Sequence, residues 1–269
     1  MKLFVFDFDG TALGGHDPYE RFPKLFVRFI DGLAARGIRW ATNSGRALEQ
    51  QFDLLQGSGV RTRPALLIGS TGTRMGWVRA GRLVHDRKHE RQTDELSRQF
   101  KKRMWPTVRT IFLKLLDKDL VDRISFDSFS PLCIIDFTCR ESCEQEVWRL
   151  MQPLLDSGDY YEFDPNRIGP SAMLFPCHMN KGAALRTLQD RLRIGPEQTI
   201  VAGDETNDLH MFDPGVAKWM VCPANANPLV KQAVRKADGI VARKRYSWGV
   251  IEGVERILKR AKGQGSSGE

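Results

Sequence analysis

The stretch of sequence that decides the fold is Leu3-Phe4-Val5-Phe6-Asp7-Phe8-Asp9-Gly10-Thr11. Its first four residues form a short apolar run, which is typical of a buried strand. A polar turn follows at once and carries two carboxylates, Asp7 and Asp9, one residue apart. In an open parallel sheet, ligands bind beyond the carboxyl ends of the strands. The stretch therefore predicts a buried strand with a functional turn at its end.

Strands and helices alternate on both sides of this stretch. The pattern predicts an amphipathic helix over residues 23–35 and another over residues 181–192. Further strands are expected over 38–41, 65–69, 199–202, 219–222 and 239–242, and the glycines at 69, 72 and 76 are expected to serve turns. Because such alternation favours a parallel sheet with helices on both faces, the expected fold class is α/β with a Rossmann-like parallel-sheet core.

The middle of the chain has a different character. A long basic helix is expected over residues 93–116, interrupted at Pro106, because proline lacks the backbone N–H that a helix needs. Paired strands, a helix and a further strand are expected over residues 123–126, 132–138, 141–155 and 160–163. This pattern predicts an inserted α/β cap domain. We expect a core domain over residues 1–80 and 176–262, a cap domain over residues 81–175, and a disordered tail over residues 263–269.

The composition excludes several classes of protein. Of the 269 residues, 41% are hydrophobic and 28% are charged, which suits a globular chain with a real core rather than a disordered or fibrous one. No apolar run approaches the roughly 18 residues of a membrane span. The first residues turn acidic at Asp7, too early for a secretory signal. The five cysteines are an odd number, which argues against a disulfide framework and favours the cytoplasm.

The charge balance agrees either with an anionic partner or simply with the solvated surfaces of ordinary helices. The formal net charge is +8, with basic residues in excess over residues 74–103 and 231–262. A basic field attracts either nucleic acid or a phosphorylated small molecule. Aromatic residues are not regularly interleaved with these charges, which disfavours nucleic acid. We therefore expect a small phosphorylated metabolite as the partner, and no membrane.

Polar residues follow three of the predicted strands and are expected to meet at one edge of the sheet. Carboxylates from separate strand ends, gathered with a lysine, suit Mg²⁺, which prefers oxygen ligands and a substrate phosphate. The ion and the lysine would offset the phosphoryl charge and let one carboxylate attack phosphorus. The candidate residues are Asp7, Asp9, Thr42, Ser44, Lys181, Asp204 and Asp208. Either Thr42 or Ser44 could be the hydroxyl that binds phosphate, and the glycine after Ser44 favours Ser44.

Four motifs carry a family resemblance. Residues 7–11, Asp-Phe-Asp-Gly-Thr, resemble the nucleophile motif of the haloacid dehalogenase-like hydrolase superfamily. Residues 44–46, 180–185 and 203–208 resemble its second, third and fourth motifs, and residues 223–226 and 247–250 resemble late signatures of its Cof-type phosphatases. The insert between the second and third motifs is similar to a type IIB cap.

The resemblance implies a role for each matched residue. Asp7 would be the nucleophile that forms an aspartyl-phosphate, and Asp9 the acid and base. Ser44 and Lys181 would hold the phosphoryl group. Thr11, Thr42, Gly45, Arg46 and Asn207 are candidates for further phosphate contacts. Asp7, Asp9 through its backbone carbonyl, Asp204 and Asp208 would form the Mg²⁺ site.

The sequence thus predicts a Mg²⁺-dependent phosphatase, a phosphoric monoester hydrolase acting on a small phosphorylated metabolite such as a sugar phosphate. A phosphomutase shares the same first motif and stays open as an alternative. So does an anion-binding protein that has lost catalysis, although the complete carboxylate set argues against it.

Overall fold

The computed structural model describes residues 1–14, 21–126, 135–155, 160–164, 171–175 and 179–265. The chain divides into two compact units, which we name the core unit, Met1–Arg87 with Lys181–Glu269, and the cap unit, Lys88–Asn180. The limits of these units lie a few residues beyond the domain boundaries expected at 80/81 and 175/176. That each unit is a domain able to fold alone stays a prediction.

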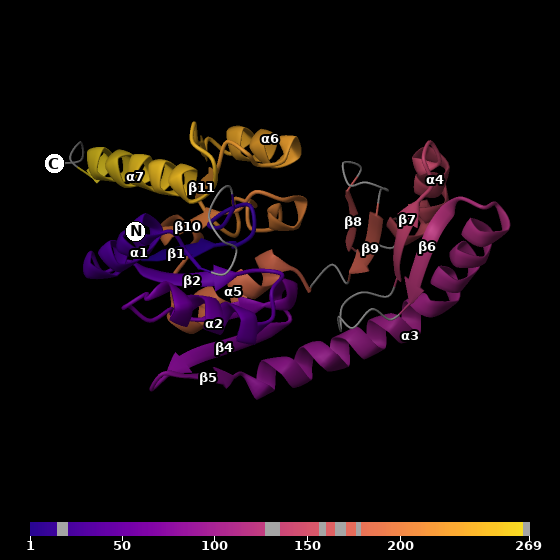
Figure 1. The fold of residues 1–269 in the computed structure, drawn as a ribbon, viewed down its shortest axis with the longest axis horizontal. Helices are drawn as coiled ribbons and strands as arrows, with labels where there is room; N and C mark the ends of the chain where they lie inside the picture. The colour runs from indigo at the N-terminus through magenta and orange to yellow at the C-terminus, as the bar shows by residue number, and fades with distance from the viewer. Residues whose placement is uncertain (15–20, 127–134, 156–159, 165–170, 176–178, 266–269) are drawn as a thin grey trace. The chain divides into compact units, whose positions relative to one another are not determined.

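The core unit is built on an eight-stranded sheet (Figure 1). Strand β1 (Leu3–Phe6) lies in its interior, between β10 (Thr199–Ala202) and β2 (Arg39–Asn43), and pairs with both in parallel. The last residue of β1, Phe6, is in register with Ala202 and Thr42, so the chain leaves all three strands at the same edge. The remaining strands are β3 (Leu67–Gly69), β4 (Arg74–Arg79), β5 (Arg82–His85), β11 (Trp219–Cys222) and β12 (Ile240–Val241). Strand β4 is antiparallel to both of its neighbours, β3 and β5.

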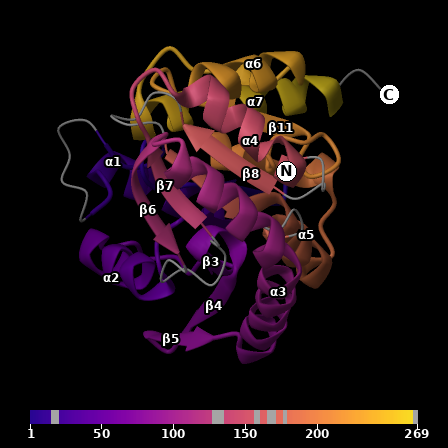
Figure 2. The same cartoon turned by 90° about the vertical axis from the view of Figure 1, so that its right-hand side faces the viewer.

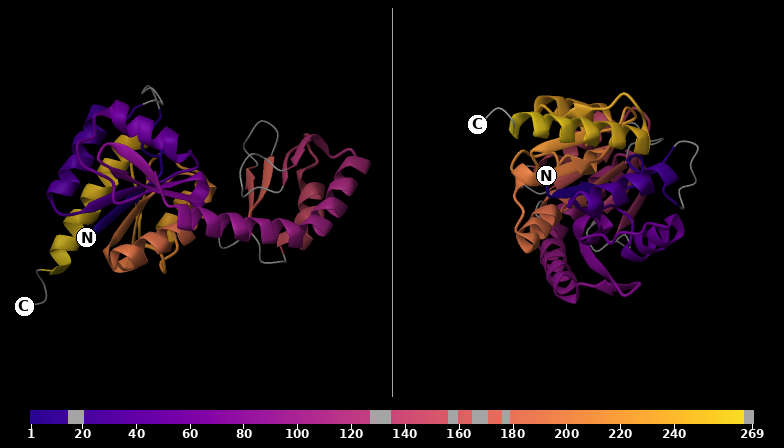
Figure 3. Two further views of the ribbon diagram at one scale, coloured as in Figure 1. Left: turned by 90° about the horizontal axis from the view of Figure 1, so that it is seen from below. Right: turned by 90° about the vertical axis from the view of Figure 1, so that its left-hand side faces the viewer.

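Two layers of helices cover the two faces of this sheet (Figure 3). Because side chains alternate along a strand, Phe4 and Phe6 enter one apolar cluster while Leu3 and Val5 enter the other. The Phe6 ring lies 5.2 Å from that of Phe26, edge to face. Helices α1 (Lys24–Ala35), α2 (Leu48–Ser58) and α7 (Tyr246–Gly265) contribute to the first cluster, and α5 (Lys181–Leu192) and α6 (Pro228–Lys236) to the second. Both faces of β1 are therefore buried, as its apolar run predicts.

The expected α/β fold class is confirmed, with two local differences in the core unit. The hairpin β4–β5 was not predicted from the sequence, and Gly76, which was expected to serve a turn, lies inside β4. Strand β2 also runs two residues further than expected, to Asn43, so Thr42 lies within a strand and not in a turn. Both residues are fully buried there.

The cap unit combines two helices with a second sheet (Figure 2). Helices α3 (Arg87–Asp117) and α4 (Glu144–Leu155) accompany the strands β6 (Val121–Phe126), β7 (Ile135–Cys139), β8 (Tyr160–Asp164) and β9 (Ser171–Phe175). The sheet order is β6-β7-β9-β8, and every pair is antiparallel. The antiparallel α/β insert expected from the sequence is present.

The interruption expected at Pro106 is wrong, because α3 continues through it. A proline inside a helix costs about 3 kcal/mol. The apolar stripe of α3 nevertheless passes Pro106 without a break. Its buried members Phe100, Met104, Val108, Ile111 and Leu115 pack in one cluster with residues of α4. We attribute the continuity of α3 to this packing, which outweighs the local preference of proline.

The described chain ends in a helix. Helix α7 reaches Gly265, so the disordered tail expected from residue 263 is wrong for residues 263–265, and residues 266–269 lie outside the described chain. No helix within the described residues is both long and apolar enough to cross a membrane. Cys139, Cys143 and Cys222 are free thiols, while Cys133 and Cys177 fall outside the described residues.

Candidate active site

The turn after β1 places Asp7 inside the protein and Asp9 outside it. The carbonyl of Phe8 accepts hydrogen bonds from the backbone N–H groups of Thr11, Ala12 and Leu13, at 3.2, 2.9 and 2.8 Å. This turn reverses the chain directly after the strand. Asp7 is 5% exposed as a result, whereas the side chain of Asp9 is 46% exposed.

Lys181 forms ion pairs with two carboxylates, those of Asp7 and Asp208. It is the first residue of α5, and its side chain is wholly buried. Its Nζ lies 3.1 Å from Asp7 Oδ1 and 2.7 Å from Asp208 Oδ1. Asp208 Oδ2 accepts hydrogen bonds from the N–H groups of Asp204 and Glu205, at 2.9 and 3.1 Å. Asp208 thus fixes both the lysine and the loop that follows β10.

Asp204 joins this loop to the turn after β1. Thr11 Oγ1 donates a hydrogen bond of 2.6 Å to Asp204 Oδ1. Gly10 has φ = +78°, and a Cβ placed on it would lie 2.0 Å from Asp204 Oδ2. Only glycine suits both this backbone conformation and this close approach. The predicted first and fourth motifs are therefore in direct contact.

The site holds more negative than positive charge. Three carboxylates, those of Asp7, Asp204 and Asp208, face one ammonium, that of Lys181. Burial, together with the charge of Asp208, raises the pKa of Asp7 to about 7 and that of Asp204 to about 8. Burial lowers the pKa of Lys181, but the charges of Asp208 and Asp7 and their hydrogen bonds raise it more, so this pKa lies above its ordinary value.

The same residues suit a divalent cation. Each of the three carboxylates offers one oxygen, and the three oxygens lie within 4.8 Å of one another. Oxygen ligands without nitrogen or sulfur favour Mg²⁺ over zinc. A charge of +2 would balance three carboxylates and one lysine. The raised pKa values of Asp7 and Asp204 agree with an acidic cluster in which one lysine offsets only part of the negative charge.

The two hydroxyls of the second motif have different surroundings. Thr42 is fully buried, and its Oγ1 donates a 2.5 Å hydrogen bond to Gln51 Oε1 on α2. Ser44 lies just beyond β2, where its Oγ accepts a 3.3 Å hydrogen bond from the N–H of Arg46. Gly45 beside it is exposed, and a Cβ placed on it would have no neighbour closer than 3.9 Å. Ser44 is itself only 1% exposed, but the residue beside it, Gly45, borders open space.

Arg46 meets Asp9 rather than standing free for a phosphate. Its Nε lies 2.7 Å from Asp9 Oδ2, and a terminal nitrogen lies 2.6 Å from Oδ1. This pairing uses both carboxylate oxygens and orients the planar groups toward each other. The phosphate contact expected of Arg46 stays a prediction.

Asn207, the remaining predicted phosphate ligand, has a buried Oδ1 without a hydrogen-bond partner among the described residues. Two further asparagines were not among the predicted site residues. Asn43 Nδ2 donates a 2.8 Å bond to the carbonyl of Lys181, and Asn225 Nδ2 donates one of 2.7 Å to the carbonyl of Gly10. A polar residue at the end of a buried strand was the available signal for Asn43.

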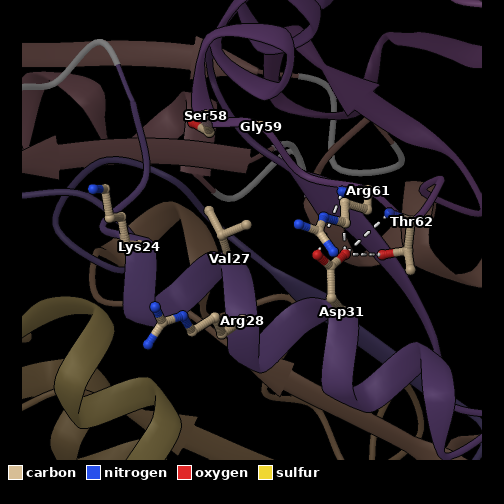
Figure 4. Close-up of a pocket in the computed structure, with 8 residues that line it drawn as sticks. All are labelled: Lys24, Val27, Arg28, Asp31, Ser58, Gly59, Arg61 and Thr62. Carbon is tan, nitrogen blue, oxygen red and sulfur yellow. Dashed lines mark hydrogen bonds between the residues drawn. The ribbon is translucent and has the colours of Figure 1, made fainter.

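A pocket of about 560 Å³ lies elsewhere in the core unit, between α1 and the residues after α2 (Figure 4). Lys24, Arg28 and Arg61 line it, together with Asp31. Asp31 accepts hydrogen bonds from the backbone N–H and the hydroxyl of Thr62, at 3.0 and 2.8 Å. The pocket contains none of the predicted site residues, so it is separate from the carboxylate site.

Fold and site together define an α/β protein of the Rossmann-like class with an acidic site at the carboxyl edge of its sheet. Residues 173–257 match the family model of sucrose-6F-phosphate phosphohydrolase. Mannosylfructose-phosphate phosphatase of Agrobacterium fabrum is 26% identical over 265 residues, which cover 93% of this chain and 98% of that protein. A phosphoglycolate phosphatase of Staphylothermus marinus is 31% identical over 119 residues, 44% of this chain and 47% of that protein.

Solved structures share the fold. The sucrose-phosphatase of Synechocystis, solved with sucrose and phosphate, superposes with a TM-score of 0.65 at 18% identity, covering 95% of this chain and 97% of that one. A haloacid dehalogenase-like hydrolase of Bacillus subtilis gives 0.61 at 13% identity, covering 96% and 92%. These likenesses in sequence and in fold support a phosphatase of the haloacid dehalogenase-like hydrolase superfamily.

Proposed function

We propose that the protein is a Mg²⁺-dependent sugar-phosphate phosphatase that works through an aspartyl-phosphate on Asp7. One observation carries the proposal: the Asp7 carboxylate is held 3.1 Å from a wholly buried lysine ammonium at the end of the strand β1. A carboxylate can attack a phosphate dianion only where their mutual repulsion is offset. Lys181 supplies part of that offset.

The roles of the other residues follow from their positions. Asp9 is the exposed carboxylate of the same turn, so it can reach the leaving oxygen, donate a proton to it, and afterwards take a proton from the attacking water. The Ser44 hydroxyl and the Nδ2 amide group of Asn207 would donate hydrogen bonds to the phosphoryl oxygens. Thr11 holds Asp204, and Thr42 stabilises the second motif from inside.

Asp7, Asp204 and Asp208, with the backbone carbonyl of Asp9, would hold Mg²⁺. When bound, the ion would offset the negative charge that gathers between the carboxylates and the phosphoryl oxygens. Lys181 and the backbone N–H groups of Asp204 and Glu205 meanwhile keep Asp208 in place.

The choice of a sugar phosphate as substrate is supported by the relatives. The family model and the relative that spans the whole chain both carry the names of enzymes that act on phosphorylated sugars. The basic surplus of the chain agrees with an anionic substrate. We also propose a cytoplasmic location, which the free thiols of Cys139, Cys143 and Cys222 support.

A substrate panel tests this proposal. The purified full chain is assayed for phosphate release from sucrose 6-phosphate, other disaccharide and monosaccharide phosphates, and phosphoglycolate, each with Mg²⁺ and with EDTA. We expect the highest kcat/KM for a sugar phosphate, and loss of turnover in EDTA and in Asp7→Asn. Preference for phosphoglycolate would contradict the substrate class. Turnover by Asp7→Asn equal to that of the wild type would contradict the mechanism.

A further inference from the structure

The loop over residues 223–227 connects the turn after β1 to the start of α7 through one side chain. Asn225 Nδ2 donates a 2.7 Å hydrogen bond to the carbonyl of Gly10. Asn225 Oδ1 accepts a 2.8 Å hydrogen bond from the N–H of Tyr246. The two ends of one amide therefore join segments that lie more than 200 positions apart in the sequence.

The Tyr246 end of this connection is firmly held. Tyr246 has a positive φ of +51°, which is uncommon for a residue with a side chain. Its ring lies against Gly14, where an added Cβ would come within 2.5 Å of it. The N–H of Ala224 also donates a 2.8 Å hydrogen bond to the carbonyl of Lys244. The backbone around Asn225 and Tyr246 is therefore held in place by contacts of its own.

At the Gly10 end, the direction of the backbone carbonyl depends on its hydrogen-bond partners. Gly10 follows Asp9 directly, and its own N–H bonds to the carbonyl of Leu13 at 3.0 Å. A glycine at φ = +78° has no Cβ to restrict its backbone, so its carbonyl direction depends on its hydrogen bonds. Among the described residues, the side chain that bonds this carbonyl is that of Asn225.

We propose that Asn225 is a positioning residue for the acid–base step. By fixing the carbonyl of Gly10 it fixes the backbone of Asp9, and hence the place from which the Asp9 carboxylate protonates the leaving oxygen. This inference rests on the function proposed above. It extends that function to Asn225, a residue outside the predicted site residues.

Two backbone hydrogen bonds hold the loop independently of the Asn225 side chain. The N–H of Asn227 donates a 2.8 Å hydrogen bond to the carbonyl of Asp204, and Ala224 is bonded to Lys244. Asn225→Ala removes neither backbone bond, so we expect the variant to fold. Asn225→Asp keeps an acceptor for Tyr246 but loses the donor for Gly10.

The test compares two esters that differ in how much they need an acid. p-Nitrophenyl phosphate releases a stable anion, whereas a sugar phosphate releases an alkoxide that must be protonated. For Asn225→Ala we expect kcat/KM to fall about tenfold on the sugar phosphate and less than about twofold on p-nitrophenyl phosphate. Asn225→Asp should show at least the same selective loss, because its carboxylate also repels the carbonyl of Gly10.

Gln189→Ala is the matched control. Gln189 Nε2 also bonds two partners in the core unit, Thr199 Oγ1 at 2.9 Å and the carbonyl of Val216 at 2.7 Å, but at the opposite end of β10 from Asp204. It should lower the melting temperature and change kcat/KM for both esters by the same factor. Suppose that the wild type is active and Asp7→Asn is not. An equal loss of kcat/KM on both esters in Asn225→Ala would then overturn the positioning role alone. A wild type inactive on both esters would overturn the proposed function as well.

Discussion

The ammonium of Lys181 lies 3.1 Å from the Asp7 carboxylate and is largely shielded from water, since the lysine side chain is wholly buried and that of Asp7 is 7% exposed. A buried lysine is retained only where carboxylates compensate its loss of hydration. Here Asp208, at 2.7 Å, is the second one. The pair therefore belongs to the fold as much as to the chemistry.

Removing the Lys181 side chain should reduce both the stability of the protein and its turnover. Lys181→Met leaves Asp7 and Asp208 buried together without a cation, so we expect the free energy of unfolding in EDTA to fall by about 3–5 kcal/mol and turnover to be lost. Denaturant unfolding followed by circular dichroism measures this. Lys218→Met is the control, because the Lys218–Glu197 pair is exposed and worth little. Equal destabilisation in both variants would show that the buried pair contributes nothing special.

The stability of the metal-free protein should depend on pH with a defined sign. The pKa values of Asp7 and Asp204 in the folded protein, about 7 and about 8, exceed the roughly 4 of an unfolded carboxyl. The folded state therefore holds protons that the unfolded state has released, and stability falls as pH rises from about 4 to about 8.

Mg²⁺ should reverse this trend, because it replaces the protons. Thermal unfolding with EDTA and with Mg²⁺, below pH 6 and above pH 8, checks this. We expect the rise in melting temperature with Mg²⁺ to be larger at the higher pH and smaller in Asp204→Asn. Ca²⁺ should support turnover poorly, since it prefers more ligands in a looser geometry. A Mg²⁺ effect that is independent of pH, or full activity in EDTA, would refute the metal assignment.

Ser44→Ala should reduce catalysis more than Thr42→Ala. A hydroxyl bonded to a charged phosphoryl oxygen is worth about 1.5–3 kcal/mol, so losing Ser44 should lower kcat/KM about tenfold to a hundredfold. Thr42→Ala leaves Gln51 Oε1 without its buried donor and should instead lower the free energy of unfolding by about 1–3 kcal/mol. Kinetics and unfolding of both variants decide the matter. A Thr42→Ala with the larger kinetic defect would reverse the assignment.

Arg46 should act through Asp9. The two-point contact between them is partly exposed, so we expect Arg46→Ala to lower kcat/KM on a sugar phosphate by about tenfold or less. Arg46→Lys keeps the charge but not the planar geometry and should recover only part of the loss. A defect confined to KM would instead indicate that Arg46 binds the substrate phosphate directly.

Local patterns in the sequence were sufficient to predict the part of the site that lies on successive strands. The apolar run before Asp7 predicts β1, and the alternation of strands and helices places the second and fourth motifs at the same edge. Helix α5 begins at Lys181, as its pattern predicts. The hairpin β4–β5 was missed because the glycines at 69, 72 and 76 are typical of turns. Gly76 instead lies inside β4, where an added Cβ would be only 3.1 Å from Leu83 and the carbonyl of Val84, so glycine serves close packing there.

Long-range partners could not be predicted in this way. The bond from Asn43 spans 138 positions in the sequence, and that from Asn225 to Gly10 spans 215. Periodicity describes which face a residue occupies, but not which loop meets it once the sheet has formed. For the same reason, the pairing of Arg46 with Asp9 emerged only from the fold.

Direct mapping of the phosphorylated residue tests the central claim most closely. The enzyme is quenched in acid during turnover of a sugar phosphate with Mg²⁺, the acyl-phosphate is reduced with borohydride, and the modified peptide is identified by mass spectrometry. We predict reduction at Asp7 in the wild type, and neither modification nor turnover in Asp7→Asn, which should bind Mg²⁺ less tightly but keep the fold. Phosphate trapped on any other residue, or undiminished turnover by a clean preparation of Asp7→Asn, would contradict the assignment of Asp7 as the nucleophile.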